Sequence, residues 1–235
     1  MIVKNKLLNY SDMVIYQNNE WFAFSLDSVL LADFVVLTNT EKNIIDLCCG
    51  NAPIGMLLSK RTNANIVSVE IQKEICDLAN KSIKENNLEK QIKIINEDIN
   101  KLNYNSDTFD IVTVNPPYFK NEVKLNANTI KSIARHEIKV SLDDIFKITK
   151  KILKNGGKFY MVHRVSRLLE ILDKMRIYNL EPKELKFVYS KVNSDSEIVL
   201  IKGIKSGKPG MKVSSFVVVH NEDGSYCDEI RRMYG

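Results

Sequence analysis

The chain has 235 residues, of which 44% are hydrophobic and 27% are charged, and its formal net charge at pH 7 is +5. This length suits one α/β domain with a full core, and the composition leaves little room for long disordered segments. No apolar run reaches the roughly 18 residues of a membrane span, and the N-terminus lacks the apolar stretch of a signal peptide.

We therefore expect a cytoplasmic protein with no membrane contact, and nothing in the sequence indicates an obligate dimer, so we expect a monomer. The positive charge permits a polyanionic partner but does not indicate one by itself. The four cysteines lack a C-x-x-C pair, and the three histidines lie far apart in the sequence. The chain is accordingly expected to hold no metal and no disulfide framework.

From residue 42 onward, apolar strand-like runs alternate with helix-like segments. This alternation is typical of a mostly parallel sheet with helices on both faces. Asn155, Gly156 and Gly157 are expected to end the helix before the fifth strand, because glycine adopts the left-handed C-terminal conformation at no steric cost. The expected elements are strands at 44–47, 65–70, 91–96, 109–114 and 158–163, and helices at 53–61, 73–87, 142–153 and 165–177.

The pattern changes after residue 180. Residues 183–190 and 196–204 are two strand-like runs separated by a short polar loop, which indicates an antiparallel hairpin that closes the sheet. We therefore predict the α/β fold class, with a seven-stranded, mostly parallel Rossmann-like sheet, helices on both faces and a C-terminal antiparallel hairpin.

Acidic residues stand where the first three predicted strands end, and strand ends are where open α/β sheets bind ligands. The first strand runs into DLCCGNAPIG, residues 46–55, whose glycine turn lets the backbone approach a ligand and leads into a helix N-terminus. Glu70 ends the second strand, 24 residues after Asp46, and is placed to accept hydrogen bonds from ribose hydroxyls. Asp98 follows the third strand and can accept from the exocyclic amine of an adenine.

These three carboxylates together indicate the kind of ligand. The G-x-G-x-x-G fingerprint of nicotinamide cofactors is absent. Like charges would repel a pyrophosphate, whereas a neutral or cationic adenosine ligand suits such a site, which points to S-adenosylmethionine. The alternative for each carboxylate taken singly is a strand-end residue that accepts hydrogen bonds from loop amides.

The fourth strand ends in TVNPPYFKN, residues 113–121. An aromatic amine is a poor nucleophile, and the side-chain oxygen of Asn115 and the carbonyl of Pro116 can each hold one of its hydrogens, which aims the nitrogen lone pair at a methyl donor. Pro117 keeps Pro116 out of the helical region, and Tyr118 can stack on an extruded base. The alternative is a proline-rich loop that only ends the strand, with Tyr118 covering the core edge.

Taken in order, these motifs resemble the class I S-adenosylmethionine-dependent methyltransferases that carry an (N/D)PP(Y/F/W) motif. FSLDSVLLA at 24–32, ARHE at 134–137, VHR at 162–164 and GKPG at 207–210 add a similarity to the bacterial tRNA1(Val) (adenine(37)-N6)-methyltransferases. The resemblance runs from about Phe24 to Lys212. It implies methyl transfer to N6 of an adenosine in tRNA, with adenosine 37 beside the anticodon of a valine tRNA as the expected target.

The resemblance also implies roles for single residues. In this family the glycine loop binds the methionine portion of the cofactor, the second strand end binds the ribose, and the third binds the adenine. A lid segment, with Asp27 and Ser28 just before its helix, would close over the cofactor. Cys48 and Ala52 depart from the family, because many methyltransferases carry glycine at those positions. The implied catalytic residues are Asn115, Pro116, Pro117 and Tyr118, and the implied cofactor-binding residues are Asp27, Ser28, Asp46, Cys48, Gly50, Asn51, Glu70, Ile71, Asp98, Ile99 and Asn115.

Within a single domain, 1–235, we expect an N-terminal lid segment at 1–40, a catalytic core at 41–204 and a basic tail at 205–235. Basic side chains could form a phosphate-binding rim for RNA, although any one lysine can equally be a solvated surface charge. The candidates for this rim are Arg135, His136, Arg164, Lys191, Lys205, Lys208 and Lys212.

Three rival functions share some of these features. Release-factor glutamine methyltransferases also use NPPY, but they usually carry a helical domain ahead of the cofactor motif, and here only 45 residues precede Asp46. A DNA adenine methyltransferase usually needs a target-recognition region, which this chain has little length to hold. A non-catalytic RNA-binding protein with a methyltransferase fold is the third alternative, and the presence of Asn115 and Glu70 speaks against it.

Overall fold

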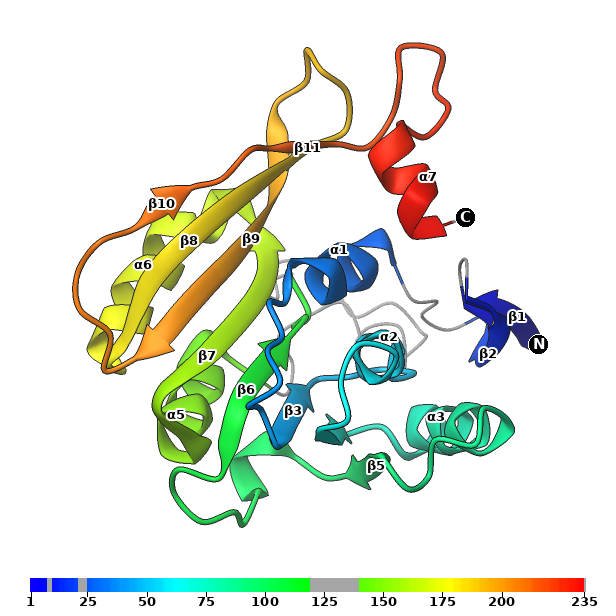
Figure 1. Cartoon of the computed structure of the whole chain (residues 1–235), viewed down its shortest axis with the longest axis horizontal. Coiled ribbons are helices and arrows are strands. Elements are labelled where there is room, and N and C mark those ends of the chain that lie inside the picture. Colours follow the sequence, from blue (N-terminus) through cyan, green and yellow to red (C-terminus); the bar gives the residue numbers. More distant parts are fainter. Residues whose placement is uncertain (8–9, 21–24, 119–139, 235) are drawn as a thin grey trace, which may run out of the picture.

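The computed structural model describes residues 1–7, 10–20, 25–118 and 140–234. Most of its strands form one central sheet with helices on both faces (Figure 1). From one edge to the other the strand order is β10–β8–β9–β7–β6–β3–β4–β5, and β11 pairs beside β8. The strands are β3 (Asn43–Leu47), β4 (Asn65–Glu70), β5 (Ile92–Asn96), β6 (Phe109–Val114), β7 (Leu153–Arg164), β8 (Leu180–Tyr189), β9 (Ser196–Lys205), β10 (Lys212–Val213) and β11 (Val217–Val218).

The strand order reverses direction at β3. This strand pairs in parallel with β4 on one side and with β6 on the other. β7 is parallel to β6, and β9 lies antiparallel between β7 and β8. The carboxyl ends of β3 and β6 therefore lie side by side at the reversal, which is where open α/β sheets bind ligands.

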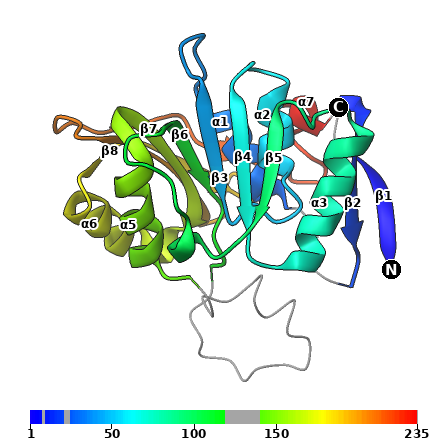
Figure 2. The same ribbon diagram turned by 90° about the horizontal axis from the view of Figure 1, so that it is seen from below.

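Alternate side chains of the central strands enter two hydrophobic clusters, one on each face of the sheet. In β3, Ile44 belongs to one cluster and Ile45 to the other, and in β6 Ile111 and Val112 divide in the same way. α1 and α2 cover the first face and α5 and α6 cover the second (Figures 1 and 2). The helices are α1 (Leu26–Phe34), α2 (Pro53–Ser59), α3 (Lys73–Glu85), α5 (Leu142–Ile152), α6 (Leu168–Ile177) and α7 (Asp228–Tyr234), with short 3₁₀ turns η1 (Ile99–Lys101) and η2 (Val165–Arg167).

The predicted α/β fold, with seven main strands from β3 to β9, is confirmed, but the predicted end of one helix is wrong. α5 ends at Ile152 and β7 follows directly, so residues 155–157 lie inside a strand and do not cap the helix. Gly156 has a φ of 75°, and the pairing of β6 with β7 shifts register between Phe109 and Ile111. Gly156 therefore adopts its left-handed conformation at an irregularity in the β6–β7 pairing, similar to a β-bulge, and not at the end of a helix.

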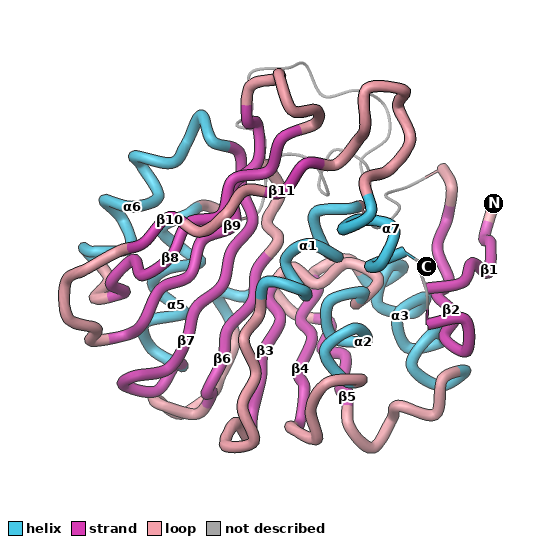
Figure 3. Tube along the Cα trace, turned by 45° about the horizontal axis from the view of Figure 1, so that its top comes forward, coloured by secondary structure: helices cyan, strands magenta, loops and turns pink. Residues whose placement is uncertain are grey.

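An N-terminal hairpin is the main element that sequence patterns did not predict. β1 (Ile2–Leu7) and β2 (Tyr10–Asn18) form a separate antiparallel sheet. The hairpin lies beside α3, at the end of the molecule away from β8 and β10 (Figure 3). The short strands β10 and β11 and the helix α7 were also not predicted.

Side chains of α3 and its C-cap hold β2 as a neighbouring strand would. The Asn86 amide accepts from the Val14 N–H at 2.9 Å and donates to the Val14 carbonyl at 2.7 Å. The Tyr16 N–H donates to the Ser82 hydroxyl at 2.8 Å. Lys4 of β1 also forms an ion pair with Glu85 of α3, at 2.6 Å. These bonds satisfy main-chain groups of β2 that would otherwise lack a sheet partner.

Within the described ranges, none of the helices combines the length and the apolar character that crossing a bilayer requires. Over the same ranges, no cluster of three or more His, Cys, Asp or Glu side chains is arranged to hold a metal ion. The division of the chain into lid, core and tail stays a prediction.

We predict that Asn86→Ala loosens the hairpin before it affects the central sheet. The change leaves both the N–H and the carbonyl of Val14 without their partner, which is expected to cost about 1–3 kcal/mol. Hydrogen exchange should show faster exchange across β1 and β2 and little change in β3 or β6. Asn105→Ala, at an exposed asparagine next to the start of β6, is the control. Equal protection of the hairpin in the two variants would contradict this role of Asn86.

Candidate active site

The loop after β3 is a coil of alternating left-handed residues. Cys48, Gly50 and Ala52 have φ values of 57°, 54° and 62°. For a residue with a side chain this conformation costs about 1–2 kcal/mol and persists only where the surroundings hold it. Here the Cys49 N–H donates to the Val69 carbonyl at 2.9 Å, which ties the loop to β4. Cys48 and Ala52 thus adopt the left-handed backbone conformation that glycine would adopt at these positions.

Glu70, at the end of β4, braces this loop. One carboxylate oxygen accepts from the Gly50 N–H at 3.1 Å, and the other accepts from the Gln72 N–H at 3.0 Å. The side chain is buried, and burial raises the pKa of Glu70. Accepting from loop amides is what a purely structural carboxylate would do, yet each oxygen keeps a second lone pair that a ribose hydroxyl could use.

Open space stands over the same loop. A Cβ added to Gly50 would meet no atom within 4 Å. A ligand can therefore approach the main chain at this position more closely than at any residue with a side chain. The residues present fit an adenosine-type cofactor here, because a bare backbone lies next to the Glu70 carboxylate, whose oxygens keep lone pairs for further hydrogen bonds.

Asp46 lies beneath the loop and has no exposed surface. One of its oxygens accepts from the Thr113 hydroxyl at 2.7 Å, and its other oxygen, Oδ2, has no hydrogen-bond partner among the described residues. Burial, opposed by the Thr113 bond and reinforced by the nearby charge of Glu70, raises the pKa of Asp46 to about 7. In the structure Asp46 is a buried residue that joins β3 to β6 through Thr113. Its assignment to the methionine portion of the cofactor stays a prediction.

Asn51 lies within the loop, and Asp98 follows β5 as the N-cap of η1. The Asn51 amide donates to the Tyr16 carbonyl of β2 at 3.0 Å and is buried, so its donor is already engaged by the hairpin. Asp98 is half-buried and accepts from the Asn100 N–H at 2.9 Å, capping η1. Ile99 follows in that turn and is buried.

Two residues that the sequence did not single out fix these strand ends. Thr113 lies opposite Asp46 in the β3–β6 pairing and supplies its hydrogen bond. Asn96, the last residue of β5, donates to the carbonyls of Glu70 and Ile71 at 3.0 and 2.9 Å and so holds the chain as it leaves β4. Both are polar residues at strand ends, which was the only signal that the sequence carried for them.

The NPPY segment leaves β6 next to this loop and contacts α1. The Asn115 amide nitrogen donates to the Ser28 hydroxyl at 3.0 Å. The Tyr118 hydroxyl lies 2.7 Å from the Asn115 side-chain oxygen and 2.9 Å from a carboxylate oxygen of Asp27. Asp27 and Ser28 lie within the first turn of α1 and not before the helix, which corrects the prediction. In this structure both residues form hydrogen bonds with the NPPY segment. The predicted lid residues and the predicted catalytic residues are therefore in contact.

The Tyr118 ring packs against the end of β7. Its centroid lies 5.2 Å from that of His163, and the Arg164 guanidinium lies 5.7 Å from the ring. His163 is fully buried and accepts from the Arg164 N–H at 2.8 Å, and burial lowers its pKa to about 4, so the imidazole is neutral. Pro116 is buried and Pro117 is half-buried. The sequence comparison included His163 only within the VHR motif and gave it no role.

The predicted RNA-binding residues do not form one group. Arg164 and Lys191 lie at the same edge of the sheet as Asn115, the former at the end of β7 and the latter in the turn between β8 and β9. Lys205 ends β9 at the opposite edge, is buried, and donates to Asp107 at 2.9 Å and to the Leu153 carbonyl at 2.7 Å. It is therefore a structural residue, and its assignment to the RNA rim was wrong.

Lys208 and Lys212 also lie away from the carboxyl edge. Lys208 follows β9, and its carbonyl accepts from Lys183 at 3.1 Å. Lys212 pairs opposite Glu184 in the middle of β8 and forms an ion pair with it at 3.2 Å. Arg135 and His136 lie outside the described residues.

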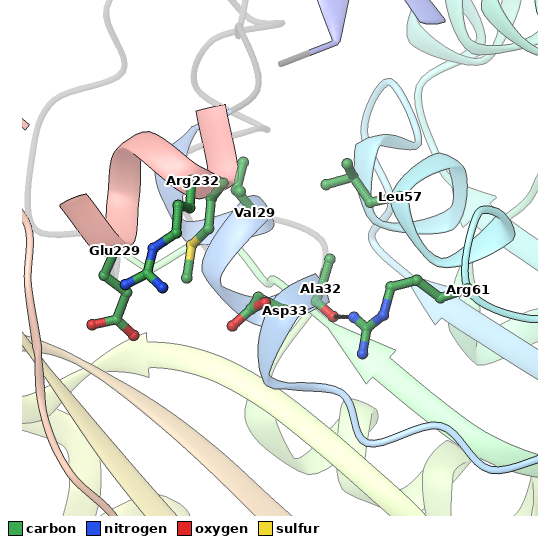
Figure 4. A pocket seen from close by; sticks show the side chains of 8 residues that line it. Val29, Ala32, Asp33, Leu57, Arg61, Glu229 and Arg232 are labelled. Carbon is green, nitrogen blue, oxygen red and sulfur yellow. Dashed lines mark hydrogen bonds between the residues drawn. The ribbon is translucent and has the colours of Figure 1, made fainter. Parts of the chain in front are cut away.

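A cavity of about 480 Å³ lies on another face of α1, between α1, α2 and α7 (Figure 4). Its lining includes Val29, Ala32 and Leu57. Arg61 donates to the Ala32 and Val35 carbonyls at 2.6 and 2.7 Å and so satisfies the C-terminal end of α1. The cavity therefore lies against α1, the helix whose first turn contacts Asn115. Its lining comes from α1, α2 and α7 and not from the NPPY segment.

Comparison with known proteins gives a consistent picture. A family model described as "Methyltransferase small domain" matches residues 25–176. The tRNA1(Val) (adenine(37)-N6)-methyltransferase of Cytophaga hutchinsonii is 21% identical over 85% of this chain and 82% of that protein. The protein of the same name from Parabacteroides distasonis is 22% identical over 96% and 94%.

Solved structures agree on the fold. A predicted O-methyltransferase, protein Atu636 from Agrobacterium tumefaciens, has a TM-score of 0.71 at 17% identity and covers 89% of this chain and 95% of its own. The tRNA m1G37 methyltransferase of M. jannaschii has a TM-score of 0.60 at 15% identity, covering 88% and 55%. At these identities the likeness shows the fold alone.

We predict that Asp46→Asn changes how stability depends on pH. The pKa of Asp46 is raised from 3.8 to about 7, so between these values the folded state binds more protons than the unfolded state and stability falls as pH rises, by at most roughly 4 kcal/mol. Asparagine keeps an acceptor for Thr113 and carries no charge, so the variant should lose this slope and be more stable than the wild type above pH 7. Urea unfolding between pH 4 and 8 measures the free energy of unfolding of both proteins and its dependence on pH.

The exposed Asp173 provides the matched control, as Asp173→Asn. Parallel pH profiles for the wild type and Asp46→Asn would show that Asp46 is not held in its uncharged form by burial.

Proposed function

The chain belongs to the methyltransferase small domain family, and on that premise we propose that it transfers the methyl group of S-adenosylmethionine to the exocyclic N6 of an adenosine in tRNA, with adenosine 37 of tRNA1(Val) as the target. Relatives with that printed name cover most of both chains. The observation that carries the proposal is the position of Asn115, which is held between α1 and Tyr118 at the end of β6, the strand paired with the one that leads into the Gly50 loop.

The chemistry of the acceptor explains the NPPY segment. The lone pair of an adenine amine is delocalised into the ring, so the nitrogen must be drawn toward a tetrahedral geometry to become nucleophilic. The Asn115 side-chain oxygen and the Pro116 carbonyl would each accept one amine hydrogen and orient the lone pair. Tyr118 offers a ring on which the base can stack, with a contribution of about 1–3 kcal/mol.

The cofactor site would be built from the loop after β3 and the ends of β4 and β5. Glu70 would take the ribose, the main chain at Gly50 would lie against the ligand, and Asp98 with Ile99 would face the adenine. When bound, S-adenosylmethionine supplies a methyl group made electrophilic by the sulfonium. Asp46 and Asn51 would act by holding the loop, since both are buried.

For the RNA, we propose Arg164 and Lys191 as phosphate contacts, because both share the edge of the sheet with Asn115. Phosphate contacts of this kind position the nucleic acid without selecting its sequence. We further propose a monomer that acts in the cytoplasm on the anticodon stem-loop of its tRNA.

Asn115→Ala should abolish most methylation while sparing cofactor binding. Losing a preorganised hydrogen-bonding group at the reacting centre costs about 10²- to 10³-fold in rate. Nucleoside mass spectrometry of tRNA incubated with the protein, followed by mapping of the methylated position, measures the product. Calorimetry measures the cofactor affinity, which we expect to change by less than about threefold.

Asn105→Ala, at the opposite edge of the sheet, serves as the control and should methylate tRNA normally. Methyl label on release factor in place of tRNA would favour the glutamine methyltransferase. Cofactor binding with no transfer to any acceptor would favour a non-catalytic RNA-binding protein.

Gly50→Ala tests the cofactor loop and has a matched control in Gly224→Ala. Both glycines have positive φ, 54° and 85°, and at both an added Cβ meets no atom within 4 Å. Each variant should therefore lose a similar amount of stability, about 1–2 kcal/mol. Only Gly50→Ala should weaken S-adenosylmethionine binding, by about tenfold or more, because the new methyl group enters the ligand space. Unchanged affinity in calorimetry would place the cofactor elsewhere.

A further inference from the structure

The contact between α1 and the NPPY segment contains more than a packing interaction. Asp27, Tyr118, Asn115 and Ser28 form one continuous chain of polar groups, with successive separations of 2.9, 2.7 and 3.0 Å. Two of these groups come from the first turn of α1 and two from the segment after β6. All four are partly or fully buried.

Counting hydrogens shows that the chain has two possible directions. The Tyr118 hydroxyl carries one hydrogen but lies within bonding distance of two acceptors, the Asp27 carboxylate and the Asn115 oxygen. When Asp27 is ionised, the charge-assisted bond to the carboxylate is the stronger of the two, so the hydrogen goes there. When Asp27 is protonated, the carboxylic acid donates to the Tyr118 oxygen, and the Tyr118 hydrogen goes to Asn115.

In the structure the Asn115 amide presents its nitrogen to the Ser28 hydroxyl at 3.0 Å and its oxygen to Tyr118. That oxygen is the acceptor that the proposed reaction needs for the target amine. A hydrogen delivered to it by Tyr118 competes with the amine.

We propose that Asp27 is a positioning residue for methyl transfer: ionised, it draws the Tyr118 hydrogen away and leaves the Asn115 oxygen to the target amine, and protonated, it directs that hydrogen onto Asn115. This inference rests on the proposed function, since it assigns the Asn115 oxygen to an amine substrate. It gives Asp27 a role toward the methyl acceptor, where the sequence had suggested a contact with the cofactor.

The groups that face Asp27 set the pH at which the change occurs. Burial raises the pKa of Asp27, while the hydrogen bond from Tyr118, the charge of Arg164 and a hydrogen bond from Ser25 oppose that rise. Arg164 is itself paired with Glu197 at 2.5 Å. His163, behind Tyr118, stays neutral because burial lowers its pKa to about 4. Activity should therefore fall as the pH drops through the raised pKa of Asp27.

A double-mutant cycle with a pH profile tests the proposal. Asp27→Asn replaces the carboxylate with an amide that can donate to Tyr118 at every pH, so it mimics the protonated state. Tyr118→Phe removes the hydrogen and keeps the ring. Single-turnover methylation of tRNA at saturating S-adenosylmethionine is measured from pH 5 to 8 for the wild type, both single variants and the double variant.

We expect Asp27→Asn to slow transfer about tenfold in the wild-type background at pH 8 and less than twofold in the Tyr118→Phe background. The acidic limb of the wild-type profile should be absent from both single variants. Calorimetry should show the same S-adenosylmethionine affinity for Asp27→Asn as for the wild type. An equal loss in both backgrounds would show that Asp27 does not act through the Tyr118 hydrogen and would overturn the proposal. A weakened cofactor affinity would make Asp27 a cofactor contact and would overturn it as well.

A readout without RNA separates this proposal from the proposed function. The side-chain amide NMR signal of Asn115, identified by its loss in Asn115→Ala, should shift with pH in the wild type and not in Tyr118→Phe. If that signal does not titrate, the hydrogen-bond chain is not controlled by Asp27. If it titrates but no RNA is methylated, the proposed function fails and the coupling between Asp27 and Asn115 stands.

Discussion

The site depends on the parallel pairing of β3 with β6. In that register Asp46 stands opposite Thr113, and a hydroxyl–carboxylate bond of 2.7 Å joins them at the ends of their strands. Because the strand order reverses here, the chain leaves β3 toward one half of the sheet and leaves β6 toward the other, and this is the position at which open α/β sheets bind ligands. Sheet pairing thus brings the Gly50 loop and Asn115 together, although they are far apart in sequence.

Elements outside the sheet complete the site from two sides. The hairpin reaches the cofactor loop through the bond from Asn51 to the Tyr16 carbonyl, and α1 reaches the NPPY segment through Ser28. Each such bond contributes only about 0.5–1.5 kcal/mol. One bond can therefore set the orientation of an element, but it cannot supply most of the free energy that keeps the element packed. α1 is held mainly by burial, since Leu30 and Leu31 enter the core cluster. A firmly packed helix can therefore present its first turn to Asn115 in one fixed position.

The sequence allowed the strands and their acidic ends to be predicted because both are local patterns: apolar runs with Asp46, Glu70 and Asp98 at their ends. It did not allow contacts between distant segments to be predicted, such as those of Asp27 and Ser28 with the NPPY segment. Gly156 has the left-handed backbone expected of a helix C-cap, but it lies in a strand. Whether such a glycine ends a helix or forms an irregularity in a strand depends on its pairing with β6, which local sequence does not indicate. Lys205 looked like any surface lysine, since nothing local indicates Asp107 as its partner.

The carboxyl groups of the site share one electrostatic property. Burial raises the pKa of Asp27, Asp46 and Glu70, and the charge of Glu70 adds to the effect on Asp46. Each ionised form is therefore destabilised by its surroundings and would be stabilised by a nearby positive charge. A sulfonium cofactor provides such a charge, whereas a nucleoside diphosphate would increase the repulsion. The preference for a cationic cofactor rests mainly on Glu70, which contacts the loop at Gly50, because Asp46 is fully buried and Asp27 contacts Tyr118.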